Sequence, residues 1–376
     1  MKQTTYFASH LFDGDTWLRN KLISVAMGRI QEITDGSQQQ ADIILDGRVA
    51  PGLIDTQVNG GGGVLLNHQP SIETLICMRN AHAKFGTTCM LPTVITDSYH
   101  VMASAADAMS EAIAVKQLGF LGIHFEGPHL SAPKRGIHPE DQIRGLSNQE
   151  FDLFCRQDIG KVVVTLAPET VPPEQIQALC NAGVIVSIGH SNATFMQTKT
   201  AVDAGATGFT HLYNAMSMSN AREPGVIGCA LNTQETFAGI IVDHMHVHDL
   251  NAKMAIKLKT PGQMMLVTDA MNFADAPESE LVFNGETILL EQGKLTTPNG
   301  TLAGSALDMM QAVVNTHHGL DLPLSTSLNM ASSSPAAFLG MSDTLGKVKV
   351  GYSADFICFN DAYKITANVC KGQSLL

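Results

Sequence analysis

The stretch LGFLGIHFEGP, residues 118–128, contains the pattern that decides the fold. A compact apolar run ends at Glu126, and the Gly127-Pro128 pair that follows interrupts regular structure. A short apolar run bounded in this way is typical of a buried β-strand. Because carboxylates are rarely buried without a partner, Glu126 at the end of such a strand indicates a functional site.

Seven more apolar runs surround this one, and most are followed by a segment long enough for a helix, such as 71–84 and 193–204. Strands that alternate with helices predict a parallel sheet, and eight such units predict a closed (β/α)8 barrel of the TIM type. The alternative is an open doubly wound sheet, which is weakened because no G-x-G-x-x-G opens a helix after a strand. The eight runs lie near 49–58, 86–95, 118–126, 161–167, 184–190, 208–212, 237–243 and 264–269.

Both ends of the chain have a different pattern, with short alternating segments separated by turn residues. We expect residues 1–50 and 336–376 to pair into one small β-sandwich domain, and residues 51–335 to form the barrel. The length of 376 residues suits a barrel with a smaller module.

Polar residues end several of the predicted strands, and in a barrel of this kind those ends meet at one mouth. Glu126, His190 and His211 follow three of the runs. Two imidazoles and one carboxylate with an open fourth position are typical of a catalytic zinc site. Asp269 ends the eighth run and is interpreted as a catalytic acid/base for the water that a metal activates. The alternative for Asp269 is a structural Asp that caps the next segment. His124 either orients Glu126 or packs inside the barrel.

The composition excludes several classes of protein. A net charge of −12 argues against a nucleic-acid partner, although a local basic pocket can still hold a small phosphorylated ligand. No apolar stretch is long enough for a membrane span, and no secretory signal is evident. The seven scattered cysteines, without a C-x-x-C, predict neither disulfides nor a structural zinc site and favour a reducing cytoplasm.

Several motifs together resemble the N-acetylglucosamine-6-phosphate deacetylases of the amidohydrolase superfamily, over essentially the whole chain. The entry to the first strand, PGLID at 51–55, is similar to the superfamily in general. The more specific motifs are IHFEGP at 123–128, GHSNA at 189–193, HLYNAM at 211–216, REPG at 222–225 and LVTDA at 266–270.

This resemblance implies hydrolysis of the acetamide of a 6-phosphorylated amino sugar. It assigns the metal to Glu126, His190 and His211, and the acid/base role to Asp269. It also places His138 near the scissile carbonyl. The implied substrate contacts are Ile137, Asn214, Ala215, Arg222, His246, Leu302, Ala303 and Gly304, with Arg222 and His246 on the phosphate side. Alternatively, Arg222 forms a surface ion pair with Glu223, and His246 is a loop histidine.

One departure from the superfamily pattern concerns the first strand, which often ends in His-x-His and builds a second metal site. Here the strand ends in Gln57-Val58-Asn59, and neutral amides are poor ligands for a borderline divalent ion. We therefore expect one metal ion at the mouth, zinc before iron, cobalt or manganese. Gln57 and Asn59 are expected to hydrogen-bond the water or neighbouring side chains.

Three rival functions remain open at this point: the same reaction on N-acetylgalactosamine 6-phosphate, another mononuclear amidohydrolase, and a sugar-phosphate-binding regulator without activity. The resemblance also implies a homodimer, in which residues 217–225 reach across to the phosphate pocket of the partner.

Overall fold

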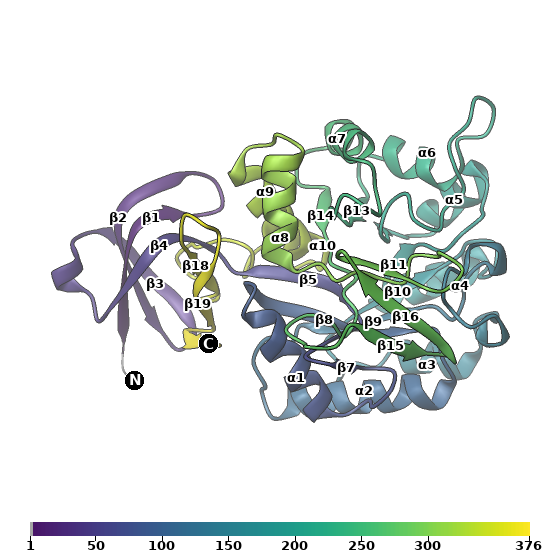
Figure 1. Ribbon diagram of the computed structural model, residues 1–376, viewed down its shortest axis with the longest axis horizontal. Helices are drawn as coiled ribbons and strands as arrows, with labels where there is room; N and C mark the ends of the chain where they lie inside the picture. The colour runs from purple at the N-terminus through teal and green to yellow at the C-terminus, as the bar shows by residue number, and fades with distance from the viewer. Residues whose placement is uncertain (1–2) are drawn as a thin grey trace.

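The computed structural model describes residues 3–376 as a barrel with a smaller β-sheet beside it (Figure 1). Eight parallel strands follow one another around the barrel in chain order, and the bridge between Val58 and Ala270 closes the circle. All eight coincide with the apolar runs of the sequence. The strands are β5 (Leu53–Val58), β8 (Thr87–Ile95), β9 (Gly122–Glu126), β10 (Lys161–Leu166), β11 (Ile185–Ile188), β12 (Gly208–Phe209), β13 (Phe237–Ile240) and β14 (Met264–Leu266).

The barrel strands are apolar because both of their faces are covered. Every residue of β8 and β9 is buried, since side chains of the barrel interior lie on one face and the surrounding helices on the other. Side-chain caps start several helices, for example Ser71 bound by the Thr74 amide and Thr194 bound by the Gln197 amide. The helices are α1 (Ile72–Ala83), α2 (Tyr99–Ala114), α3 (Asn148–Phe154), α4 (Pro173–Asn181), α5 (Phe195–Asp203), α6 (Gly225–Asn232), α7 (Asp249–Leu258), α8 (Met309–Val314), α9 (Leu324–Met330) and α10 (Ser333–Phe338).

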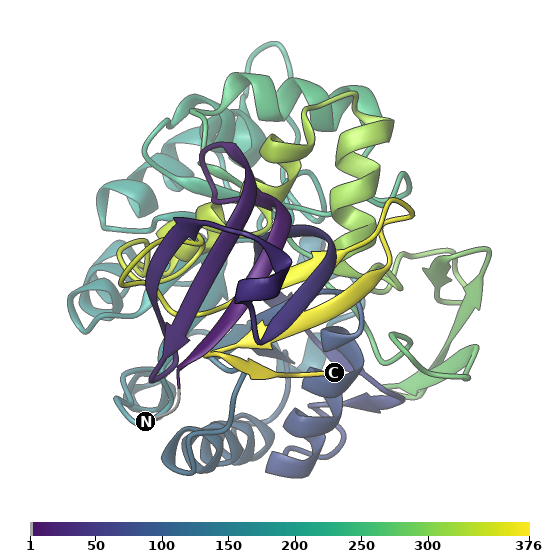
Figure 2. The same cartoon turned by 90° about the vertical axis from the view of Figure 1, so that its left-hand side faces the viewer.

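The two ends of the chain form one seven-stranded sheet, as the sequence pattern predicts (Figure 2). The strand order is β20-β19-β18-β4-β1-β2-β3, so the C-terminal strand β18 pairs with the N-terminal strand β4. This terminal sheet has a hydrophobic cluster of its own, which includes Ile23, Val49 and Phe356. The strands are β1 (Thr4–Phe12), β2 (Trp17–Ala26), β3 (Arg29–Asp35), β4 (Ile43–Pro51), β18 (Phe356–Phe359), β19 (Ile365–Cys370) and β20 (Gln373–Ser374).

A second, three-stranded sheet follows the last barrel strand, and the sequence reasoning did not anticipate it. Its strands are joined by tight turns at Asn284-Gly285 and Gln292-Gly293, all four residues with positive φ. An Asn-Gly pair between alternating apolar residues is a hairpin signal that was overlooked. The sheet packs against Ile137 and positions the loop that follows it at the barrel mouth. Its strands are β15 (Glu280–Phe283), β16 (Glu286–Glu291) and β17 (Lys294–Thr296), and a short hairpin of β6 (Gly60–Gly61) and β7 (Val64–Leu65) follows β5.

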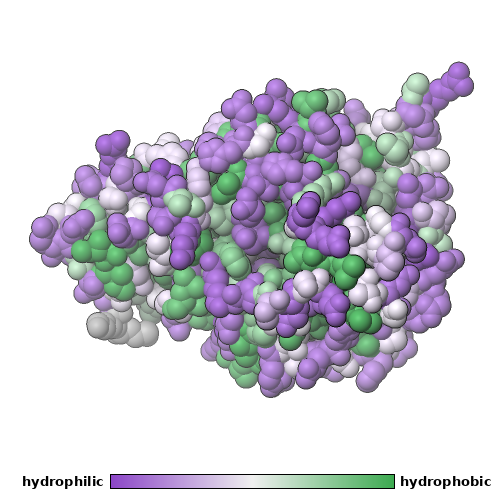
Figure 3. All heavy atoms as spheres, viewed as in Figure 1, coloured by the Kyte–Doolittle hydropathy of each residue, from purple (hydrophilic) through white to green (hydrophobic). Residues whose placement is uncertain are grey.

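The surface in the view of Figure 3 is largely hydrophilic, with small apolar patches over the terminal sheet and along the lower edge of the barrel. Within residues 3–376, no helix has the length and apolarity that crossing a bilayer requires.

Candidate active site at the barrel mouth

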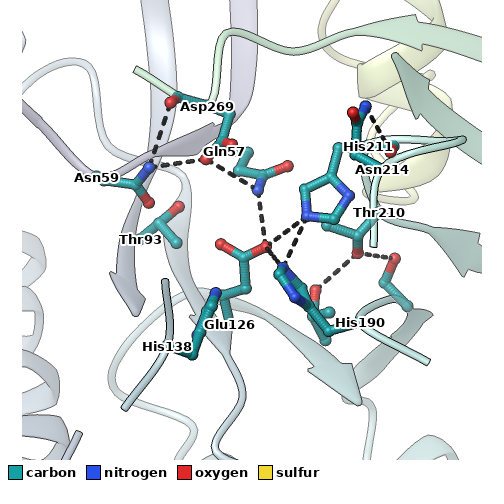
Figure 4. A network of polar contacts seen from close by, with 12 residues as sticks. Gln57, Asn59, Thr93, Glu126, His138, His190, Thr210, His211, Asn214 and Asp269 are labelled. Carbon is teal, nitrogen blue, oxygen red and sulfur yellow. Dashed lines mark hydrogen bonds and ion pairs between the residues drawn. The ribbon is translucent and has the colours of Figure 1, made fainter. Parts of the chain in front are cut away.

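Four polar side chains meet at the carboxyl ends of the barrel strands (Figure 4). Glu126 is the last residue of β9, while His190, His211 and Asp269 lie just beyond β11, β12 and β14. The last three have φ of 46°, 33° and 52°. This left-handed conformation is unfavourable for residues other than Gly, and it recurs at functional sites because it turns a side chain away from the strand direction. The backbone therefore bends at each strand end, and each side chain faces the mouth.

Three donor atoms converge on one point. The Nε2 atom of His211 lies 3.0 Å from Glu126 Oε1 and 3.0 Å from His190 Nε2, and His190 Nε2 lies 3.3 Å from the same carboxylate oxygen. His190 Nδ1 donates to the Lys134 carbonyl at 2.8 Å, so a neutral His190 carries its lone pair on Nε2. Two facing imidazole nitrogens and a carboxylate form the donor set that suits Zn²⁺, and these residues fit a divalent metal.

The charges at this point support the same interpretation. Burial raises the pKa of Glu126, but the contacts from His190 and His211 outweigh it and hold that pKa well below its ordinary value. Burial opposes protonation of His211, but the Glu126 carboxylate raises its pKa overall. The buried carboxylate is therefore ionised, and an ionised carboxylate is the form that binds a cation.

Asp269 lies beside this donor set and has its own hydrogen bonds. Its Oδ1 accepts from Asn59 Nδ2 at 2.7 Å and from Gln57 Nε2 at 3.2 Å. The same Gln57 amide donates to Glu126 Oε1 at 3.0 Å. Burial, and then the negative charge of Glu126, raise the pKa of Asp269 to about 6. A carboxyl group with a pKa near neutrality can both accept and return a proton.

His138 reaches the same space from the loop after β9. Its ring centroid is 4.3 Å from that of His190, and its Nδ1 is 2.8 Å from the Thr96 hydroxyl. Ligand atoms of Glu126, His138 and His190 lie within 4.8 Å of one another, so His138 is a rival third ligand. The geometry favours His211, whose Nε2 is 3.0 Å from both Glu126 Oε1 and His190 Nε2. Burial and the neighbouring His190 lower the pKa of His138 well below its ordinary value, so the ring is neutral.

A cavity of about 450 Å³ opens over these groups. Two predicted substrate contacts do not line it: Ala303 is fully buried beneath the loop, and Arg222 is exposed on the segment before α6. His246 lines the cavity, and its Nδ1 is 2.6 Å from Asp243 Oδ2. The remaining predicted contacts that line the cavity are Ile137, Asn214, Ala215, Leu302 and Gly304.

Sequence reasoning missed two participants of the site. Lys134 lines the cavity and holds His190 through its backbone carbonyl. Thr96, one residue beyond β8, contacts both His138 Nδ1 and the Glu126 carbonyl. Thr96 could have been found from its position at the end of a strand. Lys134 could not, because it acts through its backbone carbonyl, which every residue type has.

His124 belongs to the barrel interior. Its Nδ1 is 3.1 Å from the Thr93 hydroxyl and its Nε2 is 2.7 Å from the Thr165 hydroxyl. Burial lowers the pKa of His124 to about 4, so the ring is neutral. Of the two interpretations of His124, these contacts match the packed interior residue.

Comparisons with known proteins identify the family of the chain. Residues 48–375 match the model of the amidohydrolase family. An N-acetylgalactosamine-6-phosphate deacetylase from Shewanella sp. (strain ANA-3) is 46% identical over 88% of this chain and 84% of its own length. An N-acetylglucosamine-6-phosphate deacetylase from Haemophilus influenzae is 37% identical over 86% and 85%. The crystal structure of N-acetylglucosamine-6-phosphate deacetylase from Pasteurella multocida superposes with a TM-score of 0.95 at 34% identity and covers 99% of both chains. The chain belongs to the amidohydrolase family.

Proposed function

We propose that this protein hydrolyses the N-acetyl group of N-acetylglucosamine 6-phosphate and releases acetate and glucosamine 6-phosphate, a step of amino-sugar catabolism. The observation that carries the proposal is the convergence of Glu126, His190 and His211 beside Asp269 in one cavity. Relatives that align over most of the chain are named as deacetylases of N-acetylhexosamine 6-phosphates.

One divalent ion, zinc before iron, cobalt or manganese, would be held at the mouth by Glu126, His190 and His211. When bound, it would supply Lewis acidity to the acetyl carbonyl and lower the pKa of a water molecule. Gln57 and Asn59 occupy the two positions at the end of the first barrel strand at which a second metal site would require histidines. Both amides donate hydrogen bonds to carboxylates instead, which supports a single ion at the mouth.

Proton transfer falls to Asp269 in this proposal. The carboxylate takes a proton from the attacking water and later passes it to the amine as the C–N bond breaks. His138 lies beside the scissile carbonyl in this proposal and stabilises the oxyanion that forms there. The Thr96 hydroxyl donates to the Glu126 carbonyl at 3.1 Å, and its oxygen lies 2.8 Å from His138 Nδ1, a contact that fixes the orientation of the ring.

We assign the phosphate end of the substrate to Asn214, Ala215 and His246, which all line the cavity. Asp243 Oδ2 accepts a hydrogen bond from His246 Nδ1 at 2.6 Å and fixes the orientation of the ring. Ile137, Leu302 and Gly304 line other parts of the cavity and would contact the sugar, with Ala303 supporting that loop from below.

Arg222 would complete the phosphate pocket of a second copy in a homodimer. It lies outside the cavity of its own chain, on an exposed segment with Met218, which is 73% exposed. Leu250, Met254 and Leu258 are also exposed at four-residue intervals along α7, which places them on one face. Exposed apolar surface of this kind supports an interface between two copies.

A subunit-mixing experiment tests this arrangement. Arg222→Ala and Asp269→Asn homodimers should each be nearly inactive. Mixed dimers should recover activity, because the Asp269→Asn subunit supplies Arg222 to the cavity that retains Asp269. Arg19→Ala, at an exposed position of the terminal sheet, is the control. Mixtures without recovery, or an active monomer in dilute solution, would contradict the trans arrangement.

N-acetylgalactosamine 6-phosphate is the second candidate substrate, because the relative that is 46% identical is named for that sugar. The two sugars differ in the configuration of one hydroxyl group. Acetate release with each sugar, measured side by side as kcat/KM, decides between them. We expect the higher value for the gluco sugar; a higher value for the galacto sugar reverses the assignment, and no acetate from either contradicts the deacetylase proposal.

We also place the protein in the cytoplasm. All seven cysteines are free thiols, which is the state that a reducing compartment maintains.

A further inference from the structure

Two buried thiols and a carboxylate meet where the terminal sheet joins the barrel. Cys89 lies near the start of β8, Asp355 directly precedes β18, and Cys370 ends β19. Their ligand atoms all lie within 4.8 Å of one another. The three residues are 4%, 7% and 0% exposed. The cluster therefore combines three segments that are far apart in the sequence.

Asp355 has no direct ion-pair partner among residues 3–376, although the charge of Lys371 acts on it from a greater distance. The Lys371 backbone amide donates to it at 2.6 Å, and the other carboxylate oxygen lies 4.0 Å from Cys89 Sγ. Among residues 3–376, no Lys, Arg or His forms an ion pair with it. A buried carboxylate is costly unless it is paired or coordinates a metal. Burial raises the pKa of Asp355, and the adjacent Cys370 thiol together with burial raises that of Cys89.

We propose that Cys89, Asp355 and Cys370 bind a second, structural zinc ion, separate from the site at the barrel mouth. The proposal differs from the sequence expectation that the scattered cysteines form no structural zinc site. The spacing of the ligands along the chain gave no signal for it, because the fold alone brings β8 and β19 together.

The donor set selects the ion. Two thiolates and one carboxylate favour a borderline-soft divalent cation over calcium or magnesium. Zinc–sulfur bonds are about 2.3 Å long, so ligands of a tetrahedral ion are about 3.8 Å apart, and small side-chain movements suffice here. Apolar neighbours such as Ile54, Leu91 and Leu339 belong to the same cluster as the two cysteines and limit the access of water. A water molecule or a backbone carbonyl would fill the fourth position.

The ion would fasten the terminal sheet to the barrel. Strands β18 and β19 lie on the barrel side of that sheet (Figure 1). Several hydrogen bonds already join the parts here, for example from Gly52 N to Asp355 O at 3.0 Å and from Thr88 Oγ1 to Asn368 Oδ1 at 2.7 Å. Cys89 is near the amino end of β8, whereas the catalytic mouth is at the carboxyl end. The site therefore belongs to the face of the barrel that serves stability.

The test uses thiolate ligation, which the mouth site cannot provide. The full-length protein is freed of metal under reducing conditions and titrated with Co²⁺ or Cd²⁺, while the ultraviolet thiolate-to-metal charge-transfer band is recorded. We expect one equivalent to produce the band. His190→Ala should retain it, and Cys89→Ser and Cys370→Ser should lose it. Cys229→Ser is the matched control and should keep it, because Cys229 is a buried thiol hydrogen-bonded to the Thr233 hydroxyl.

Metal content gives the second readout. Protein purified under reducing conditions with zinc should contain two equivalents, and Asp355→Asn one, with kcat for acetate release unchanged. Absence of the band in the folded wild-type protein, or equal zinc content in the wild type and both cysteine variants, would overturn the proposal. A Cys89–Cys370 disulfide in freshly isolated protein would overturn it as well. None of the three contradicting outcomes depends on the deacetylase activity.

Discussion

The side-chain amide of Gln57 donates a hydrogen bond to Glu126 Oε1 at 3.0 Å. The same nitrogen is 3.2 Å from Asp269 Oδ1, so one neutral amide lies between two buried carboxylates. Like charges at short range in a buried site repel strongly, and a shared donor reduces that repulsion. Gln57 therefore allows a metal-binding carboxylate and a proton-transfer carboxylate to remain adjacent.

Gln57→Leu should lower activity while the protein still folds. The apolar side chain fills similar space but leaves both carboxylates without their shared donor. Loss of such an orienting partner typically costs roughly 10–100-fold in metal affinity or activity. Kinetics at saturating zinc, together with a zinc-binding isotherm, check this. Gln69→Leu, at an exposed position before α1, is the control; equal behaviour of the two variants would contradict the role of Gln57.

Asp269→Asn should abolish turnover while it preserves the fold and the metal content of the mouth. The amide can still accept from Asn59, but it cannot take a proton from water. Acetate release, zinc analysis and circular dichroism of the same sample check the prediction. Near-normal activity would show that another group is the base.

The pH dependence of kcat/KM should show an acid limb that belongs to Asp269. The carboxylate must be ionised to accept a proton, and burial and Glu126 raise its pKa to about 6. Activity is therefore retained above this pKa and lost as the pH falls through it. A bound cation would counteract this increase and lower the pKa of Asp269, so the midpoint of the acid limb is expected at or below about 6. A midpoint above 7, or the same limb in the residual activity of Asp269→Asn, would contradict the assignment.

His138→Ala should reduce kcat by roughly 10²–10³-fold, the typical cost of one lost oxyanion donor, without eliminating activity. Thr96→Val should produce a smaller loss, because it removes the contact that orients the ring and leaves the imidazole in place. Steady-state kinetics of both variants at several zinc concentrations separate this role from metal binding. Activity of His138→Ala that excess zinc restores would identify His138 as a metal ligand instead.

Much of the fold could be predicted because a parallel barrel has a local signature. Each strand is buried on both faces and reads as an apolar run, and every strand end lies at the same mouth. Glu126 and Asp269 could therefore be placed near each other, although their distance in the sequence is large. The hairpin at Asn284-Gly285 was missed because its strands are half-exposed and short.

Other features could not be predicted from the sequence because they depend on tertiary contacts. The pairing of Cys89 with Cys370 follows only from the docking of β19 against β8. The Lys134 carbonyl that fixes His190 is a backbone group, which any residue type supplies. Residue type alone also did not show that Arg222 lies outside the cavity of its own chain.

The central claim is tested most directly by acetate release from N-acetylglucosamine 6-phosphate. The release is measured before the metal is removed, after its removal and again after zinc is restored. The metal-free protein should be inactive, and zinc should restore activity in the wild type but not in a variant in which His190 and His211 are both Ala. Full activity without metal, or restoration by zinc in that double variant, would contradict a hydrolytic site built from Glu126, His190 and His211.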